Sequence, residues 1–98
     1  MIHVKVSYTV KPEFVAANQE NIRRFLKDFA AMDGNAFRYD VFLLPDGLTF
    51  LHLSQYENQA VQQQILKVPS FLEFQKKRDQ SGLEGSHQVE ILEPVLLR

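Results

Sequence analysis

The stretch FLHLSQYEN, residues 50–58, carries a histidine, a serine and a tyrosine at alternate positions. Alternate side chains of an extended strand project from the same face, so His52, Ser54 and Tyr56 should lie side by side. An imidazole titrates near neutral pH and can act as a general base that removes a proton from a bound ligand. His52 is therefore the candidate catalytic residue. A buried or interface histidine bonded to a carboxylate or a backbone group would occupy the same position, and that alternative stays open.

Other polar and aromatic side chains are candidates for holding a small planar ligand. A cation such as Lys5 or Arg38 could stabilise the anion that forms when a ligand loses a proton, and an aromatic ring could stack on a flat ligand. Arg38 and Asp40 could equally form an ion pair across a subunit interface, and Phe42 and Tyr56 could fill the interior of a barrel. The candidate substrate-binding residues are Lys5, Arg38, Phe42, Ser54 and Tyr56.

Periodic patterns indicate the elements that must position these side chains. Residues 2–10 alternate strictly between apolar and polar, and two further extended segments flank the turn sequence PDG at 45–47. Helical periodicity follows the first strand and the third strand, with an interruption at Pro69. The predicted order is β-α-β-β-α-β, which gives an α+β, ferredoxin-like fold with an antiparallel four-stranded sheet and helices on one face. The expected strands are residues 2–10, 36–44, 48–56 and 87–96, and the expected helical segments are residues 12–33 and 58–78.

The face assigned to each strand decides where the candidate residues lie. We expect the aliphatic residues Val4, Val6, Leu51 and Leu53 to face the helices and form the core. Aromatic rings among the polar groups of the opposite, open face would be unusual in contact with water and predict that a second sheet covers it. The open face would then carry His3, Lys5, Ser7, Arg38, Asp40, Phe42, His52, Ser54 and Tyr56.

Composition excludes several classes of protein. A length of 98 residues fits one domain, residues 1–98, and a net charge of −1 gives no reason to expect nucleic acid as a partner. No apolar run is long enough to cross a membrane. The sequence opens without a basic segment followed by an apolar one, so we expect no membrane association and a cytoplasmic location.

Metal and cofactor motifs are also missing from the sequence. The chain has no cysteine, which excludes disulfides and thiolate ligands, and its three histidines fall on three separate predicted strands. No glycine-rich phosphate loop or nucleophile motif is present. The basic run from Lys76 to Arg78 reads as a solvated helix end. We therefore expect neither a metal nor an organic cofactor.

Three segments resemble a known family. They are VKP at 10–12, FRYDVF at 37–42 and YENQAVQQQILKVPSFLEF at 56–74. With the element order, they resemble the antibiotic biosynthesis monooxygenase family of dimeric α+β barrels. The resemblance implies a homodimer whose two sheets pack face to face, with a pocket in each subunit. It also implies an activity among those of the family, which include cofactor-free monooxygenases of polycyclic phenols, quinol oxidases and haem-degrading enzymes.

Several family positions are altered in this chain. The family's third strand commonly reads Tyr-Glu-x-Trp, and those positions hold Leu53, Ser54, Gln55 and Tyr56 here. A His-Phe pair that often follows a proline in the second helix is replaced by Ser70 and Phe71. Because residues 58–80 contain no histidine, we expect no haem ligation through this helix.

Two functions of different classes follow from these observations. The first is a cofactor-independent monooxygenase or quinol-type oxidase that acts on a small planar phenolic or quinone-like molecule, with His52 as proton acceptor and Arg38 or Lys5 stabilising the anion. The second is a non-catalytic dimeric module that binds a small ligand, aromatic or otherwise. Loss of titratable family residues favours the second, and the resemblance favours the first.

Overall fold

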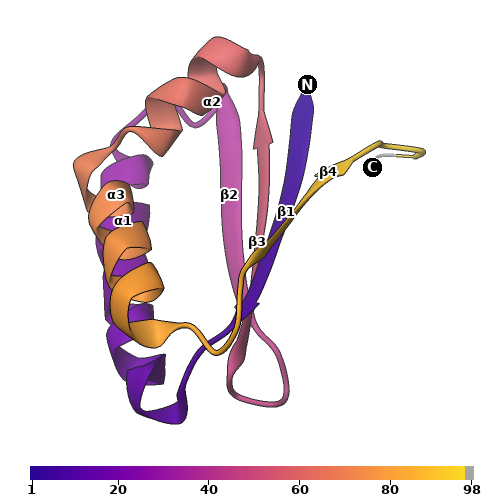
Figure 1. Cartoon of the computed structure of the whole chain (residues 1–98). Coiled ribbons are helices and arrows are strands. Elements are labelled where there is room, and N and C mark those ends of the chain that lie inside the picture. Colours follow the sequence, from indigo (N-terminus) through magenta and orange to yellow (C-terminus); the bar gives the residue numbers. More distant parts are fainter. Residues whose placement is uncertain (97–98) are drawn as a thin grey trace.

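The computed structural model describes residues 1–96, which form a four-stranded sheet with helices on one face (Figure 1). This arrangement confirms the predicted α+β, ferredoxin-like fold. Two short turns of helix, labelled η, precede α1 and follow α3. The elements in chain order are β1 (Ile2–Thr9), η1 (Pro12–Phe14), α1 (Val15–Ala30), β2 (Phe37–Leu43), β3 (Thr49–Tyr56), α2 (Gln59–Leu66), α3 (Pro69–Lys77), η2 (Arg78–Gly82) and β4 (Gln88–Leu92).

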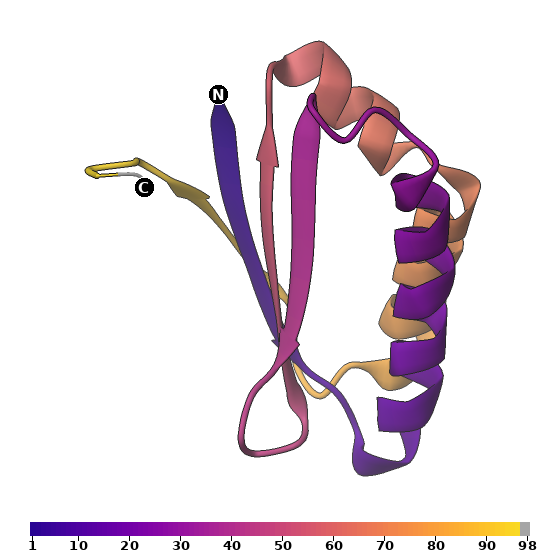
Figure 2. The ribbon, with the colours of Figure 1, turned by 180° about the vertical axis from the view of Figure 1, so that it is seen from behind.

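The strands are antiparallel throughout and lie in the order β2-β3-β1-β4. The PDG turn joins β2 to β3 as expected, because Gly47 adopts a positive φ of 71° and Asp46 accepts hydrogen bonds from the backbone of Leu48 and Thr49. Seen from behind, the sheet and the helices form two layers, and β4 leans away from the other strands towards its C-terminal end (Figure 2). The edge strand β4 is exposed along its whole length.

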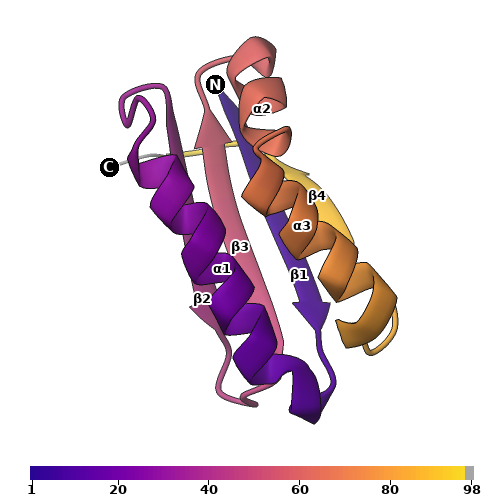
Figure 3. The same cartoon turned by 90° about the vertical axis from the view of Figure 1, so that its left-hand side faces the viewer.

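The helices follow from local sequence signals. In α1, apolar residues at Ile22, Phe25 and Phe29 recur at steps of three and four and are buried against the sheet. Asn58 caps α2 by accepting a hydrogen bond from the backbone of Val61. Pro69 occupies the first turn of α3, and so the second helical segment is divided into α2 and α3. In the view onto the helix layer, α1 and α3 run side by side across the sheet (Figure 3).

The predicted face of β3 is wrong, whereas the faces of β1 and β2 are as expected. Val6 pairs with His52 and Tyr8 pairs with Phe50 across the sheet, and residues directly opposite each other share a face. Because Val4 and Tyr8 face the helices, Phe50, His52 and Tyr56 must face them too, and all three are buried. Burial of these large rings outweighs burial of Leu51 and Leu53, which lie on the open face. His52, Ser54 and Tyr56 are therefore on the helix side of the sheet.

Candidate functional site

A cavity of about 160 Å³ lies between the sheet and the helix layer. An engineered apolar cavity of about 150 Å³ holds one benzene molecule, so this space accommodates one aromatic ring. Its walls are mostly apolar and aromatic, with a few polar side chains from the strands, α2 and α3. The lining residues are Val4, Val6, Tyr39, His52, Ser54, Tyr56, Gln62, Leu66, Phe71, Phe74, Gln75, Arg78, His87 and Val89.

His52 sits at the inner wall of this cavity in a chain of hydrogen bonds. Its side chain is 2% exposed, and both ring nitrogens are engaged. Nε2 lies 2.7 Å from the hydroxyl of Tyr8, and Nδ1 lies 2.8 Å from the hydroxyl of Tyr39. Asn18 extends the chain by donating from Nδ2 to the Tyr8 hydroxyl at 3.0 Å. The polar atoms of the buried imidazole are thus satisfied within the protein.

The surroundings of His52 favour the neutral imidazole. Burial and, to a smaller extent, the nearby positive charge of Arg78 together lower the pKa of His52 from 6.5 to about 3. Burial also raises the pKa of the Tyr8 and Tyr39 hydroxyls well above the usual value for a phenol. At neutral pH the chain of hydrogen bonds is therefore uncharged, and each of its hydroxyls keeps its proton.

We expect the low pKa of His52 to make the fold sensitive to acid. Unfolded chains bind a proton at this residue below about pH 6.5, whereas the folded protein does so only near pH 3. The stabilisation is fully present above pH 6.5 and is lost as the pH falls through this window, at up to about 1.4 kcal/mol per pH unit. Denaturant unfolding at a series of pH values measures the slope. His52→Gln, which has no titrating group, should flatten the curve, and equal slopes for the two proteins would contradict the assignment.

Arg78 brings a buried positive charge to the cavity. Its side chain is 4% exposed, and its guanidinium lies 5.1 Å from the ring centre of Tyr8 and 5.3 Å from that of Phe74. These cation–π contacts offset part of the cost of burying the charge. Nε donates to Asp79 at 2.9 Å, and Arg78 is one of the residues that line the cavity. The prediction of a solvated helix end is wrong for Arg78. The chain turns at η2, and the Arg78 side chain is buried against the rings of Tyr8 and Phe74.

The structure divides the candidate residues between the two faces of the sheet. His52, Ser54 and Tyr56 line the cavity together. Lys5 and Arg38 do not reach it, since both project from the open face, where Lys5 lies 3.7 Å from Glu90. Phe42 also lies on the open face and is 48% exposed. The cation nearest the candidate catalytic residue is therefore Arg78.

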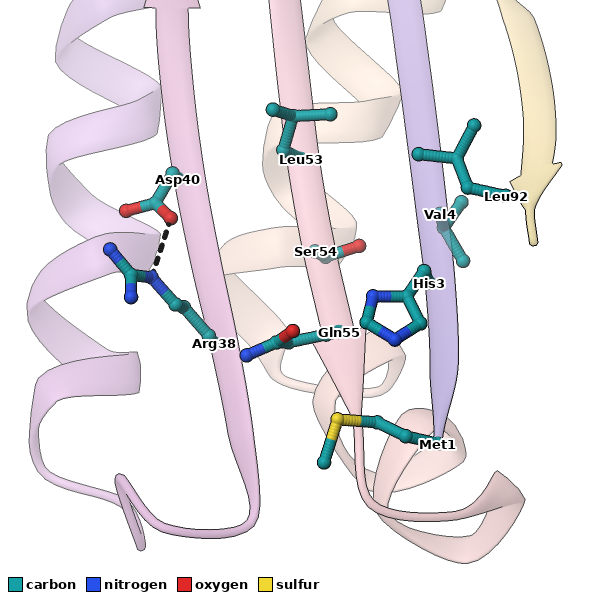
Figure 4. A pocket seen from close by; sticks show the side chains of 9 residues that line it. All are labelled: Met1, His3, Val4, Arg38, Asp40, Leu53, Ser54, Gln55 and Leu92. Atoms are coloured by element: carbon teal, nitrogen blue, oxygen red, sulfur yellow. Dashed lines mark hydrogen bonds and ion pairs between the residues drawn. The ribbon is translucent and has the colours of Figure 1, made fainter. Parts of the chain in front are cut away.

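The open face has a wider hollow of its own, about 460 Å³ in volume (Figure 4). Its lining residues come mainly from the first three strands: Met1, His3, Val4, Arg38, Asp40, Leu53, Ser54, Gln55 and Leu92. Arg38 donates from Nε to Asp40 at 2.9 Å on the same strand, and both side chains are exposed to water. An exposed ion pair of this kind contributes little to binding or stability. The hollow is more open to solvent than the cavity on the helix side, which is therefore the stronger candidate site.

Sequence patterns missed four residues of this site: Tyr8, Tyr39, Asn18 and Arg78. Tyr8 and Tyr39 lie on the helix-facing sides of β1 and β2, and nothing in the local sequence distinguishes them from core residues. Asn18 lies on the buried stripe of α1 and is fully buried, so a polar residue at a stripe position was the available signal. Nothing in the local sequence distinguishes Arg78 from the exposed Lys76 and Lys77 beside it.

Residues 1–96 contain neither a candidate metal site nor a helix that could span a membrane. Within that range no group of three or more histidine or acidic side chains is close enough to hold a metal ion. His52 and His87 both line the cavity, but no third ligand accompanies them. None of the helices described has the length and apolar character needed to cross a bilayer.

Comparison with known proteins identifies a family and a fold. The family model described as antibiotic biosynthesis monooxygenase matches residues 1–77. A crystal structure of an antibiotic biosynthesis monooxygenase matches with a TM-score of 0.84 and 14% identity, covering 98% of this chain and 100% of that chain. Structures from Mycobacterium tuberculosis and Pseudomonas aeruginosa, each 18% identical, match with TM-scores of 0.82 and 0.80. They cover 98% and 97% of this chain and 96% and 94% of their own.

Identities this low establish a shared fold and leave the activity of the chain open. A search of curated proteins finds no match.

Proposed function

Because the chain belongs to the antibiotic biosynthesis monooxygenase family, we propose that it is a cofactor-independent monooxygenase or quinol-type oxidase of a small planar phenol or hydroquinone. One observation carries the proposal: a cavity the size of one ring, with aromatic walls, holds a buried guanidinium beside a histidine hydrogen-bonded to two tyrosines. Apolar walls with a few convergent polar groups are typical of sites for small molecules.

The chemistry needs the ring in its electron-rich, ionised form. A phenolate gives up electrons to dioxygen more readily than the neutral phenol does. The Arg78 guanidinium, which is buried at the wall of the cavity, would stabilise that negative charge. A hydroquinone would lose two electrons and two protons to dioxygen and leave quinone and hydrogen peroxide. In the monooxygenase reaction, one oxygen atom enters the phenol to give a quinone, the other leaves as water, and the substrate supplies both electrons.

His52 takes a different part in this proposal from that of a free base. Its two ring nitrogens are occupied by Tyr8 and Tyr39, so a ligand in the cavity meets the Tyr39 hydroxyl first. A proton would travel between ligand and His52 only through that hydroxyl. His52 is thus proposed as a positioning and proton-carrying residue, while Ser54 and Tyr56 shape the wall against which the ring packs.

Oxygen uptake tests the proposal directly. Hydroquinones, simple phenols and anthrone-like phenols should be screened with the wild-type protein and with His52→Ala in an oxygen electrode. The size of the cavity favours the single-ring compounds, and turnover should fall in the variant. Turnover that is unchanged by His52→Ala would remove this residue from the mechanism, and no uptake with any compound would contradict the oxidase.

The second candidate function is a dimeric binding module without catalysis. The specific observation in its favour is that both nitrogens of His52 are engaged and its pKa is lowered to about 3, which makes it a weak base. Such a module would bind a ring in the same cavity and leave it unchanged. Saturable binding of a phenol without oxygen uptake would favour this alternative over the enzyme.

A homodimer is part of both proposals. Phe42 is 48% exposed on the open face, where the half-buried Leu51 and Leu53 also lie. Ile91 of the edge strand β4 is 70% exposed on the opposite side. The apolar side chains of β2 and β3 fit a second copy of the sheet that would cover the open face, and Ile91 fits a part of that copy that extends past β4.

We expect Phe42→Asp to convert this dimer into a monomer. A carboxylate at residue 42, on the covered face of β2, would be buried without a partner, which opposes association by several kcal/mol. Sedimentation velocity at micromolar concentration should give the dimer mass for the wild type and the monomer mass for the variant. Asp33→Asn, which lies outside the sheet, serves as the control and should remain dimeric. A monomeric wild type would contradict the proposed assembly.

A further inference from the structure

We infer that Tyr39 donates its hydroxyl hydrogen to an oxygen atom of a single-ring ligand in the cavity and so selects phenolates and quinones over apolar rings. This inference rests on the proposed function, because it places the ligand in the same cavity. It adds the chemical feature that the site recognises and the residue that recognises it.

Counting donors and acceptors along the buried chain gives the direction of its hydrogen bonds. Asn18 donates to the oxygen of Tyr8, which leaves the hydrogen of Tyr8 to be donated to Nε2 of His52. A neutral imidazole carries one N–H, so with Nε2 as acceptor the hydrogen is on Nδ1. Nδ1 then donates to the oxygen of Tyr39. The hydrogen of Tyr39 is not used in the chain.

The opposite direction is less favourable. If Tyr39 donated to Nδ1, then Nε2 would donate to Tyr8, whose oxygen already accepts from Asn18. With Nδ2 of Asn18 facing Tyr8, as in the structure, the hydrogen of Tyr8 would have no acceptor, and Tyr8 is buried without lining the cavity. The buried Oδ1 of Asn18 has no partner in either direction of the chain. A buried donor left unpaired costs about 1–3 kcal/mol. In the favoured direction the unused hydrogen belongs to Tyr39, which lines the cavity and can reach a ligand.

The cavity supplies complementary features for such a ligand. Its volume of about 160 Å³ suits one ring, and Phe71 and Phe74 provide aromatic walls. Arg78 lines the same space and favours an oxygen with negative charge. The cavity is therefore lined by two donors to ligand oxygen, one of them charged. A phenolate or a quinone carbonyl can accept from both, and a methyl group can accept from neither.

A pair of nearly isosteric probes tests the inference. Binding of para-fluorophenol and para-fluorotoluene is measured by fluorine NMR with the wild type and Tyr39→Phe. The affinity for para-fluorophenol relative to that for para-fluorotoluene should fall by about three- to tenfold when the hydroxyl is removed. This is the effect expected for the loss of one hydrogen bond. Affinity for fluorotoluene itself should stay the same, since Tyr39→Phe keeps the ring that packs in the wall.

A second variant tests the direction of the chain. In Asn18→Asp an acceptor replaces the donor, so Tyr8 would donate to the new carboxylate and the whole chain would reverse. Tyr39 would then donate its hydrogen bond to His52, and the preference for the phenol should fall as it does in Tyr39→Phe. Thermal unfolding shows whether Asn18→Asp is folded. If it is not folded, the result with Tyr39→Phe alone decides the inference.

The possible outcomes separate this inference from the proposed function. If both probes bind and Tyr39→Phe leaves their affinity ratio unchanged, the inference is overturned while the ring-binding cavity stands. If neither probe binds to the wild type, the cavity is not a site for rings, and the proposed function fails together with the inference. A selective loss of fluorophenol affinity supports both.

Discussion

Arg78→Met should reduce kcat/KM for the phenol or hydroquinone identified by oxygen uptake by about 100- to 1,000-fold, the effect of removing one preorganised donor from a developing anion. Methionine preserves much of the apolar volume that packs on Tyr8 and Phe74, so the variant should fold. The loss should be concentrated in the affinity for ionised ligands, because only these use the charge. Steady-state oxygen uptake across a range of substrate concentrations measures it.

A matched control distinguishes the effect of losing Arg78 from the effect of losing an arginine elsewhere on the protein. Arg24 lies on the exposed side of α1, where it pairs with Glu20, and Arg24→Met should retain the wild-type rate. A further readout follows from electrostatics, since the charge of Arg78 lowers the pKa of His52. Arg78→Met should therefore raise that pKa, which NMR of the imidazole can follow. Equal activity and an unchanged His52 pKa in Arg78→Met would show that the guanidinium does not act on the cavity.

Phe25→Ala should lower the free energy of unfolding by about 3–5 kcal/mol, as expected for truncation of a fully buried phenylalanine. Phe25 is 0% exposed, and its ring packs edge-on against Phe71, Phe74 and Tyr39 at centroid distances of 4.9–5.5 Å. Its removal would leave a void between the sheet and the helices α1 and α3, and the surrounding rings could not move enough to fill that void. Urea unfolding followed by circular dichroism gives the difference.

Leu72→Ala provides the comparison for Phe25→Ala. Leu72 is on α3, and its side chain is 49% exposed, so its truncation removes little packing and should change stability by about 0.5 kcal/mol or less. A small domain has about 5–15 kcal/mol of stability in total, so the loss at Phe25 is a large share. Similar values for the two variants would mean that the aromatic cluster is not the centre of the core.

The architecture could be predicted from the sequence because its signals are local. Strict alternation in residues 2–10, the PDG turn and the helical stripe of α1 each depend on neighbours within a few residues. Their order is sufficient for a ferredoxin-like fold, and the structure confirms it. The division of the second helix at Pro69 follows from the same kind of signal.

The site was harder to predict because it depends on pairing between distant strands. Along β3, leucines and aromatic residues alternate, so either face looks apolar when the strand is read alone. The register with β1 decides the question, and a change of parity moves every side chain to the other face. His52 was therefore singled out correctly as unusual but assigned to the wrong side. Its partners Tyr8 and Tyr39 are far away in sequence.

Arg78 shows a second limit of local patterns. It follows two exposed lysines at the end of α3, and a basic helix end is ordinarily solvated. Its burial is caused by the π-helical turn of η2, together with the rings of Tyr8 and Phe74 that receive the guanidinium. The ring of Tyr8 comes from β1, at the other end of the chain, so the contact exists only in the folded protein.

Mapping the binding of para-fluorophenol by NMR tests the central claim most directly, because the claim concerns which side of the sheet holds the ring. The account predicts that the ligand shifts the signals of Tyr39, His52, Phe71 and Arg78, which line the enclosed cavity. It predicts no comparable shifts at Arg38 or in the rest of the hollow on the open face. Saturable shifts confined to the residues of that hollow, with the cavity signals unchanged, would contradict the account.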